Sequence, residues 1–221
     1  MGGTRAPTIR ANRAGGAVVL LLGAVLVALA GRLAGAELER QAGGDVLRAL
    51  RAGDAVSAAA LDRLSRATEA ALAWRPSGEG RATLGLVRLT RAARSPAPVP
   101  HLERAAESLR ASLRRRPASP HTWARLARTR YRLGMPARDV AAALRRSLAT
   151  GAHVPRLAAG RASLALRLWP ALHRDGRWRR ELARGWLRRP ALLTRTARAT
   201  DRSAVLGRAV AGARSSETTA P

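Results

Sequence analysis

The chain has 221 residues, long enough for one or two domains with a substantial core, and 47% of them are hydrophobic, which argues against a wholly disordered protein. It contains no cysteine, so disulfides, thiolate nucleophiles and cysteine metal sites are excluded. All 41 basic residues are arginine, only 14 residues are acidic, and the formal net charge is +27. Both a GC-rich codon usage and an anionic partner would explain this charge, and in either case the surface attracts anions.

The N-terminal segment has the charge pattern of a membrane anchor. Residues 1–13 carry three arginines and no acid, and the run from Ala14 to Gly31 is free of charge. A helix over that run spans about 27 Å, enough for the hydrocarbon core of a bilayer. We therefore predict a basic cytoplasmic N-terminus over 1–13 and a transmembrane signal anchor over 14–36. A cleaved signal peptide is the alternative, because Ala28 to Ala30 and Ala34 to Ala36 both fit an A-x-A cleavage site.

The arginines before the apolar run favour a cytoplasmic N-terminus. The expected location is thus the cytoplasmic (inner) membrane, crossed once, with the C-terminal domain in the periplasm or otherwise outside the cytoplasm. A nucleic-acid partner is not expected, because it would require that domain to remain in the cytoplasm.

After the anchor, the sequence predicts an all-α domain, because Ala, Leu and Arg are good helix formers and β-branched residues are sparse. Residues 37–54 are expected to form a linker or short helix, residues 55–212 the helical domain, and residues 213–221 a disordered tail. Amphipathic helices separated by Pro, Gly and Ser are predicted over 55–74, 81–93, 101–115, 120–133, 136–149, 155–169, 177–188, 191–199 and 202–210. Pro170 is expected to end one helix and Asp201 to cap the start of the last one.

Three segments share one local pattern, in which an amphipathic helix is followed by a break with proline and then by another helix. The prolines are Pro76, Pro117 and Pro155, which lie 41 and 38 residues apart. A helical hairpin of this length cannot bury its apolar face alone, and stacking on neighbouring hairpins solves that problem.

The middle segment, SLRRRPASPHTWARLARTRYRLG, resembles a tetratricopeptide repeat. The matching positions, which we expect to pack between repeats, are Ala105, Leu109, Pro117, Trp123, Leu126, Ala127 and Gly134. The resemblance implies a transmembrane helix followed by a TPR-like array of helical hairpins, an irregular α-solenoid, as in single-pass membrane-anchored bacterial repeat proteins, some of them linked to envelope or exopolysaccharide assembly. The spacings exceed the usual 34 residues and the connector SPAPVP is inserted, so an irregular helical bundle remains the alternative.

The arginines of this segment are candidate anion-binding residues. Arg125, Arg128 and Arg132 are spaced three and four apart, so they share a helix face away from the apolar stripe. Arg114, Arg115 and Arg116 lie at the end of a helix, where the helix dipole favours cations.

The sequence offers no pattern for catalysis, metal binding or a cofactor. A P-loop is excluded because there is no lysine, and the four histidines (His101, His121, His153 and His173) lack a partner at metal-ligand spacing. We therefore expect no enzymatic activity. The predicted function is a membrane-anchored scaffold for protein–protein interaction, in bacterial envelope or exopolysaccharide assembly. The alternative is a membrane-tethered binder of an acidic polymer or anionic lipid, which would use the arginine-rich faces of Arg110 to Arg138 and Arg177 to Arg202.

Overall fold

A computed structural model describes residues 19, 22–27, 29–31 and 43–218. The chain divides into two compact units, 1–67 and 68–221, and the division falls within one helix. The expected membrane helix over 14–36 lies mostly outside the described residues. Those of its residues that are described are helical and exposed, including Val19, Leu26 and Val27. None of the helices in the described ranges has both the length and the apolar character needed to cross a bilayer.

The described part of the chain is helical throughout, which confirms the all-α prediction. Residues 43–52 form a first helix. The labelled helices are α2 (Ala58–Trp74), α3 (Gly78–Arg94), α4 (Pro98–Arg115), α5 (Pro120–Arg132), α6 (Ala137–Thr150), α7 (Pro155–Arg167), α8 (Trp169–Leu172), α9 (Arg177–Arg188), α10 (Pro190–Ala199) and α11 (Ser203–Thr218).

Local sequence explains most helix starts. Proline occupies one of the first two positions of α4, α5, α7 and α10, where its fixed φ suits a helix and its missing N–H costs no hydrogen bond. Serine caps α3 and α5: the Ser77 hydroxyl accepts from the Gly80 N–H at 3.0 Å, and the Ser119 hydroxyl accepts from the Thr122 N–H at 3.4 Å.

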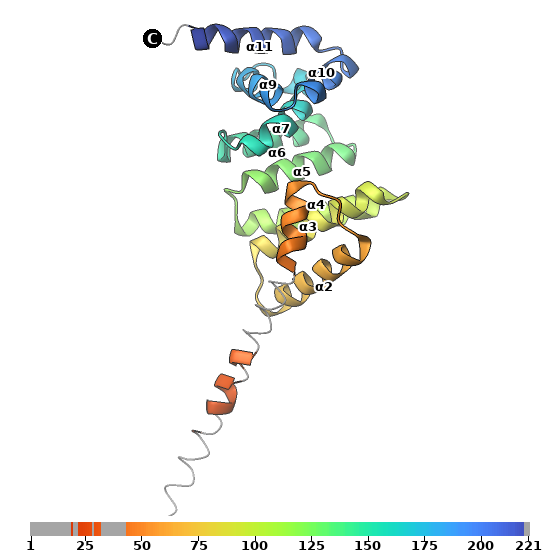
Figure 1. The fold of residues 1–221 in the computed structure, drawn as a ribbon, viewed down its shortest axis with the longest axis vertical. Helices are drawn as coiled ribbons and strands as arrows, with labels where there is room; N and C mark the ends of the chain where they lie inside the picture. Colours follow the sequence, from red (N-terminus) through yellow and green to blue (C-terminus); the bar gives the residue numbers. More distant parts are fainter. Residues whose placement is uncertain (1–18, 20–21, 28, 32–42, 219–221) are drawn as a thin grey trace, which may run out of the picture. The chain divides into compact units, whose positions relative to one another are not determined.

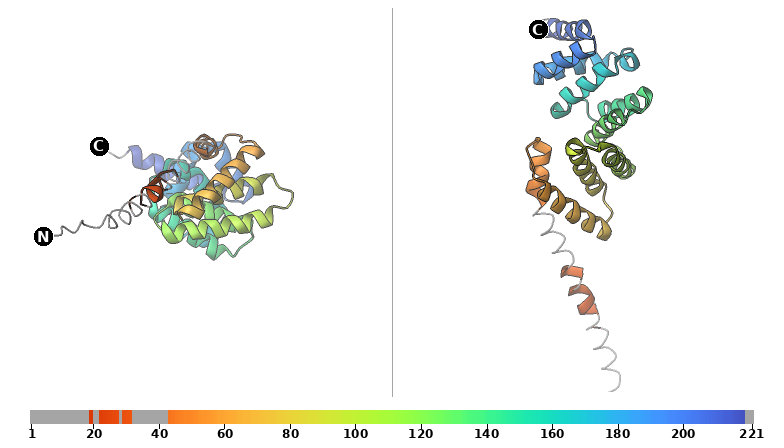
Figure 2. Two further views of the ribbon diagram at one scale, coloured as in Figure 1. Left: turned by 90° about the horizontal axis from the view of Figure 1, so that it is seen from below. Right: turned by 90° about the vertical axis from the view of Figure 1, so that its right-hand side faces the viewer.

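In the second unit the helices pack as sequential pairs. α3 packs on α4, α5 on α6, and α7 on α9, while α11 packs on α9 and α10 (Figure 1). The first helices of successive pairs also touch, since α5 contacts both α3 and α7. The right-hand view of Figure 2 also shows these pairs following one another in chain order. One continuous apolar cluster runs through the pairs from α4 to α11, with its fully buried leucines at Leu109, Leu126, Leu144, Leu166, Leu182 and Leu193.

Glycine allows two of these pairs to approach closely. A Cβ on Gly85 of α3 would lie 2.7 Å from the side chain of Leu109 in α4. A Cβ on Gly185 of α9 would lie 2.5 Å from the Cβ of Ala162 and 3.0 Å from the carbonyl oxygen of Ala158, both in α7. The α7–α9 contact is therefore tight at the level of the backbone.

Two boundaries differ from the sequence prediction. The helix predicted to end before Pro170 does end there, at Arg167, but Pro170 itself lies at the second position of the short α8, where proline is tolerated. At the C-terminus, α11 continues to Thr218, so most of the segment expected to be a disordered tail (213–221) is helical.

The prediction that Asp201 caps the start of α11 is wrong, because Asp201 terminates α10. Its φ is +52°, its N–H bonds the carbonyl of Arg198 at 3.2 Å, and the N–H of Arg202 bonds the carbonyl of Ala197 at 2.7 Å. These two bonds around a left-handed residue form a Schellman motif. Gly134 ends α5 with the same motif, and its φ is +67°.

Replacing Asp201 with glycine should stabilise the protein. A left-handed conformation costs an L-residue about 1 kcal/mol, which glycine avoids. The Asp201→Gly variant is expected to raise the thermal midpoint by a few degrees, as measured by circular dichroism. The reverse change, Gly134→Asp, should lower it; an unchanged midpoint in both variants would contradict this assignment of the two turns.

Candidate functional site

Of the seven residues expected to pack between repeats, four lie in the core, on α4 and α5. Ala105, Leu109, Leu126 and Ala127 are buried. The remaining three have local roles. Trp123 is half-buried and its Nε1 donates to the carbonyl of the exposed Pro117 at 2.7 Å, while Gly134 forms the turn after α5.

The six arginines predicted to bind anions form two groups, not one site. Arg114, Arg115 and Arg116 are exposed at the end of α4, where Arg116 lies 4.0 Å from Glu79 at the start of α3. Arg132 lies at the other end of α3, since its Nη2 donates to the carbonyl of Ala92 at 3.3 Å. Arg125 and Arg128 are on α5 with Arg132.

Two members of the second group, Arg128 and Arg132, belong to a positively charged face across α5 and α7. We call it the α5–α7 face, and it consists of Arg128, Tyr131, Arg132 and Arg167. The guanidinium of Arg167 lies 5.8 Å from the centre of the Tyr131 ring, and its Nη1 is 3.5 Å from the Tyr131 hydroxyl. The head group of Arg128 lies against Gly160 of α7, although much of the side chain is exposed. Burial of this head group lowers the pKa of Arg128, and the charge of Arg132 lowers it further. The face thus holds positive charge that no acid on it neutralises.

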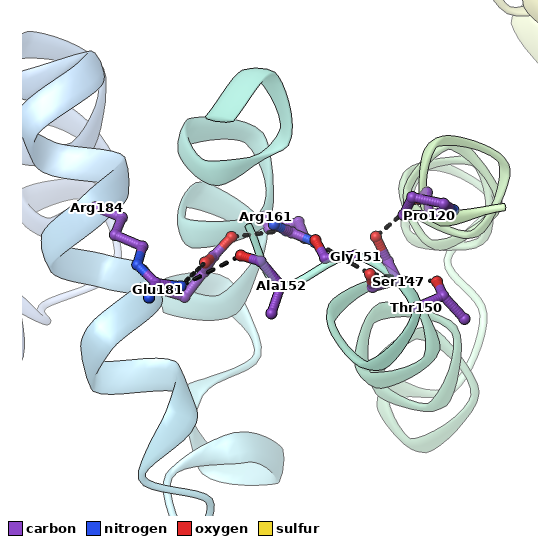
Figure 3. Close-up of polar contacts among 8 residues, drawn as sticks. All are labelled: Pro120, Ser147, Thr150, Gly151, Ala152, Arg161, Glu181 and Arg184. Atoms are coloured by element: carbon purple, nitrogen blue, oxygen red, sulfur yellow. Dashed lines mark hydrogen bonds and ion pairs between the residues drawn. The ribbon is translucent and has the colours of Figure 1, made fainter. Parts of the chain in front are cut away.

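A second arrangement, which the sequence did not predict, is a buried ion pair between α7 and α9 (Figure 3). Arg161 Nε donates to Glu181 Oε1 at 2.6 Å, and both side chains are 1% exposed. Arg161 Nη1 also donates to the carbonyls of Ser147 and Gly151, at 3.0 and 2.8 Å. The Ser147 hydroxyl donates to the carbonyl of Pro120 at 2.8 Å. This polar chain connects four helices, from α5 through α6 and α7 to α9.

The pair is incompletely satisfied. Arg161 Nη2, Glu181 Oε2 and the indole nitrogen of the nearby buried Trp178 have no hydrogen-bond partner within the described part of the chain. Burial raises the pKa of Glu181, and the attraction of Arg161 opposes this only in part. Such an arrangement is costly to hold in an apolar core.

A hollow of about 250 Å³, which we call the α9 pocket, lies beside this pair. Its polar lining comes from His153, Arg177, Arg180 and Arg184, and its apolar lining from Leu148, Ala149 and Ala152. The three arginines lie on one face of α9, because they are spaced by three and four residues.

Two of the three pocket arginines are held in place. Arg177 donates through Nε and Nη2 to the two carboxylate oxygens of Asp175, at 3.0 and 2.9 Å. These hydrogen bonds lower the pKa of Asp175 and raise the pKa of Arg177. Arg184 Nη1 donates to the carbonyl of Ala152 at 3.2 Å and lies 4.0 Å from Glu181 Oε2. Arg180 is exposed and has no such tie to the rest of the described chain.

No family model, curated protein or solved structure matches this chain. The case for a function therefore rests on its own residues. The described part contains no group of three or more His, Asp or Glu side chains placed to hold a metal ion. What it offers instead is guanidinium groups arranged on two surfaces, which suits the recognition of anionic groups.

From the sequence, Arg177 to Arg202 are grouped only as an arginine-rich face, and the α9 pocket is not predicted. Arg177, Arg180 and Arg184 look like any solvated helix face, and His153 looks like an isolated surface residue. The spacing of the three arginines could have grouped them, but the pocket also needs the loop after α6, and only the tertiary fold brings that loop to α9.

Proposed function

We propose that this chain is a membrane-anchored helical-repeat scaffold that holds an acidic segment of a partner protein on the α5–α7 face. The observation that carries the proposal is that this face combines charge and an exposed aromatic ring on two successive helical pairs: Tyr131 is 39% exposed between Arg128, Arg132 and Arg167. Repeat arrays present such continuous faces to extended or helical segments.

The proposed architecture is an irregular α-solenoid of the TPR type. It is supported by the sequential pairing of helices and by the succession of contacts from α3 to α5 to α7. The short α8, which interrupts the α7–α9 pair, is a departure from regular repeats.

Anchoring in the inner membrane, with the helical domain outside the cytoplasm, is also part of the proposal. Its support is the uncharged run from Ala14 to Gly31 after an arginine-containing N-terminus. The exposure of Val19, Leu26 and Val27 agrees with a lipid-facing role for this segment.

The test compares two acidic probes on the full chain in neutral nanodiscs: an amphipathic helical peptide rich in Glu and Leu, and polyglutamate of the same charge. A scaffold should prefer the amphipathic peptide, retain it at moderate salt, and bind it about tenfold more weakly in Tyr131→Ala, a change of about 1.4 kcal/mol. The control is Leu187→Ala, since Leu187 is an exposed apolar residue of α9 that is not part of this face.

The opposite result would favour the second candidate, a binder of acidic polymers or anionic lipids. In that case both probes would bind alike, both would be released by salt, and Tyr131→Ala would change neither. That outcome would contradict the scaffold proposal.

A further inference from the structure

We propose that the α9 pocket binds a phosphate group through Arg177, Arg180 and Arg184. This site is distinct from the α5–α7 face and does not depend on the scaffold function proposed above.

The local charge balance favours a dianion. The pocket and the ion pair beside it contain four arginines (Arg161, Arg177, Arg180 and Arg184) and two carboxylates (Asp175 and Glu181), which leaves two positive charges. A phosphate monoester carries about −1.5 to −2 at neutral pH, so it would neutralise this excess. His153 lines the same pocket and offers a further donor.

The arginines are oriented before any ligand arrives. Asp175 fixes the plane of the Arg177 guanidinium through two hydrogen bonds, which leaves its Nη1 hydrogens free for another acceptor. The carbonyl of Ala152 holds Arg184 by one hydrogen, and four of its donors remain. Arg180 is exposed, and all N–H donors of its guanidinium group are available to a ligand. Guanidinium forks of this kind match the oxygen geometry of phosphate.

Glu181 limits how the pocket can be used. Its carboxylate is buried and paired with Arg161, and its Oε2 lies 4.0 Å from Arg184 Nη1, so an anion bound to Arg184 must tolerate this nearby negative charge. A volume of about 250 Å³ is below the usual range of about 300–1,000 Å³ for small-molecule sites, so it suits one anionic head group and not a whole nucleotide.

A second hollow, of about 410 Å³, is a poorer candidate. It is lined by Arg145 and Arg174, but the carboxylate of Asp175 also faces it and repels an anion. Arg145 Nη2 is already bonded to the carbonyl of Ala171 at 2.5 Å.

The test is isothermal titration of inorganic phosphate into the full chain in phosphatidylcholine nanodiscs. We expect saturable binding of one phosphate per chain, weakened at least tenfold in Arg180→Ala. The matched control is Arg179→Ala, which removes the same charge from the neighbouring exposed position outside the pocket. It should change the affinity less than twofold.

Three outcomes would overturn the assignment. The first is an absence of saturable binding. The second is an equal loss of affinity in Arg179→Ala and Arg180→Ala, which would indicate diffuse attraction to a chain of charge +27. The third is equally tight, Arg180-dependent binding of malonate, a dicarboxylate.

A second arm distinguishes free phosphate from a lipid head group. Nanodiscs containing phosphatidic acid, whose head group is a phosphate monoester, replace the neutral ones. If the lipid competes with inorganic phosphate and Arg180→Ala weakens both, the pocket accepts the head group. If phosphate binding alone depends on Arg180, the ligand is a soluble phosphate; both results support the site.

Discussion

Replacing Glu181 with leucine should lower the free energy of unfolding by about 3–5 kcal/mol, one of the two largest effects expected from a single substitution in this chain. The change leaves Arg161 buried with its charge uncompensated, although its bonds to the carbonyls of Ser147 and Gly151 remain. Arginine cannot lose its proton inside a protein, so the buried guanidinium can regain contact with water only if the structure around it unfolds locally.

The reciprocal change, Arg161→Met, should cost less than Glu181→Leu. The stranded Glu181 can take up a proton, and burial already raises its pKa. The double variant Arg161→Met, Glu181→Leu should recover most of the loss, since replacing a buried pair by apolar side chains is often neutral or stabilising. A coupling energy of about 2 kcal/mol or more between the two positions is expected from the cycle.

The pH dependence of Arg161→Met provides an independent readout. Without Arg161, burial of Glu181 is opposed only by the weaker attractions of Arg184 and His153, so the folded-state pKa of Glu181 lies further above that of the unfolded chain. The folded state then binds the extra proton, and stability is greatest below the unfolded pKa and falls as pH rises through the raised one. The double variant should lack this slope.

Chemical denaturation of the full chain in detergent, followed by circular dichroism, measures these differences. The control is Glu107→Leu, the same substitution at an exposed position of α4, which should remain within about 0.5 kcal/mol of the wild type. If Glu181→Leu were as mild as Glu107→Leu, the side chains would not be buried as a pair.

The helix that contributes to this ion pair could be predicted from the sequence, but the ion pair itself could not. The helix that contains Glu181 was predicted with both ends correct, because its repeating apolar positions and the proline after it are local signals. Whether an individual charged residue on that helix faces water or the core is decided by the neighbouring helix. Arg161 and Glu181 are 20 residues apart and carry no local mark of burial.

Gly185→Val is the second substitution with a large expected effect, a loss of about 3 kcal/mol or more. The added Cβ alone would meet the Cβ of Ala162 at 2.5 Å and the carbonyl oxygen of Ala158 at 3.0 Å. A carbonyl oxygen within a helix cannot rotate away, so α7 and α9 would have to move apart. Their separation would also stretch the contact of Arg161 with Glu181 on the same two helices.

The matched control is Gly207→Val in α11, where a Cβ would meet nothing within 4 Å. Both variants place the same β-branched residue in a helix, so differences in helix propensity cancel. Thermal midpoints followed by circular dichroism should separate the two clearly. Equal midpoints would mean that the α7–α9 contact is looser than the structure shows.

The resemblance to tetratricopeptide repeats pointed to small residues between helices, and at Ala105 and Ala127 the prediction placed them in the core. Gly185 was not among them. In the sequence, a glycine within a helix indicates only low helix propensity. The presence of Gly185 is explained by the alanines of α7 that face it. In contrast, proline at the first turn of α5 and α7 fixed those boundaries well, because its effect is local.

α11 covers apolar surface of the helices that precede it. Leu206 and Ala209 are buried in the apolar cluster, whereas Gly207 and Arg208 are exposed to solvent. Because α11 contacts α9 and α10, its removal would expose the apolar side chains of these two helices. A chain truncated after α10 is therefore expected to self-associate through this uncovered surface.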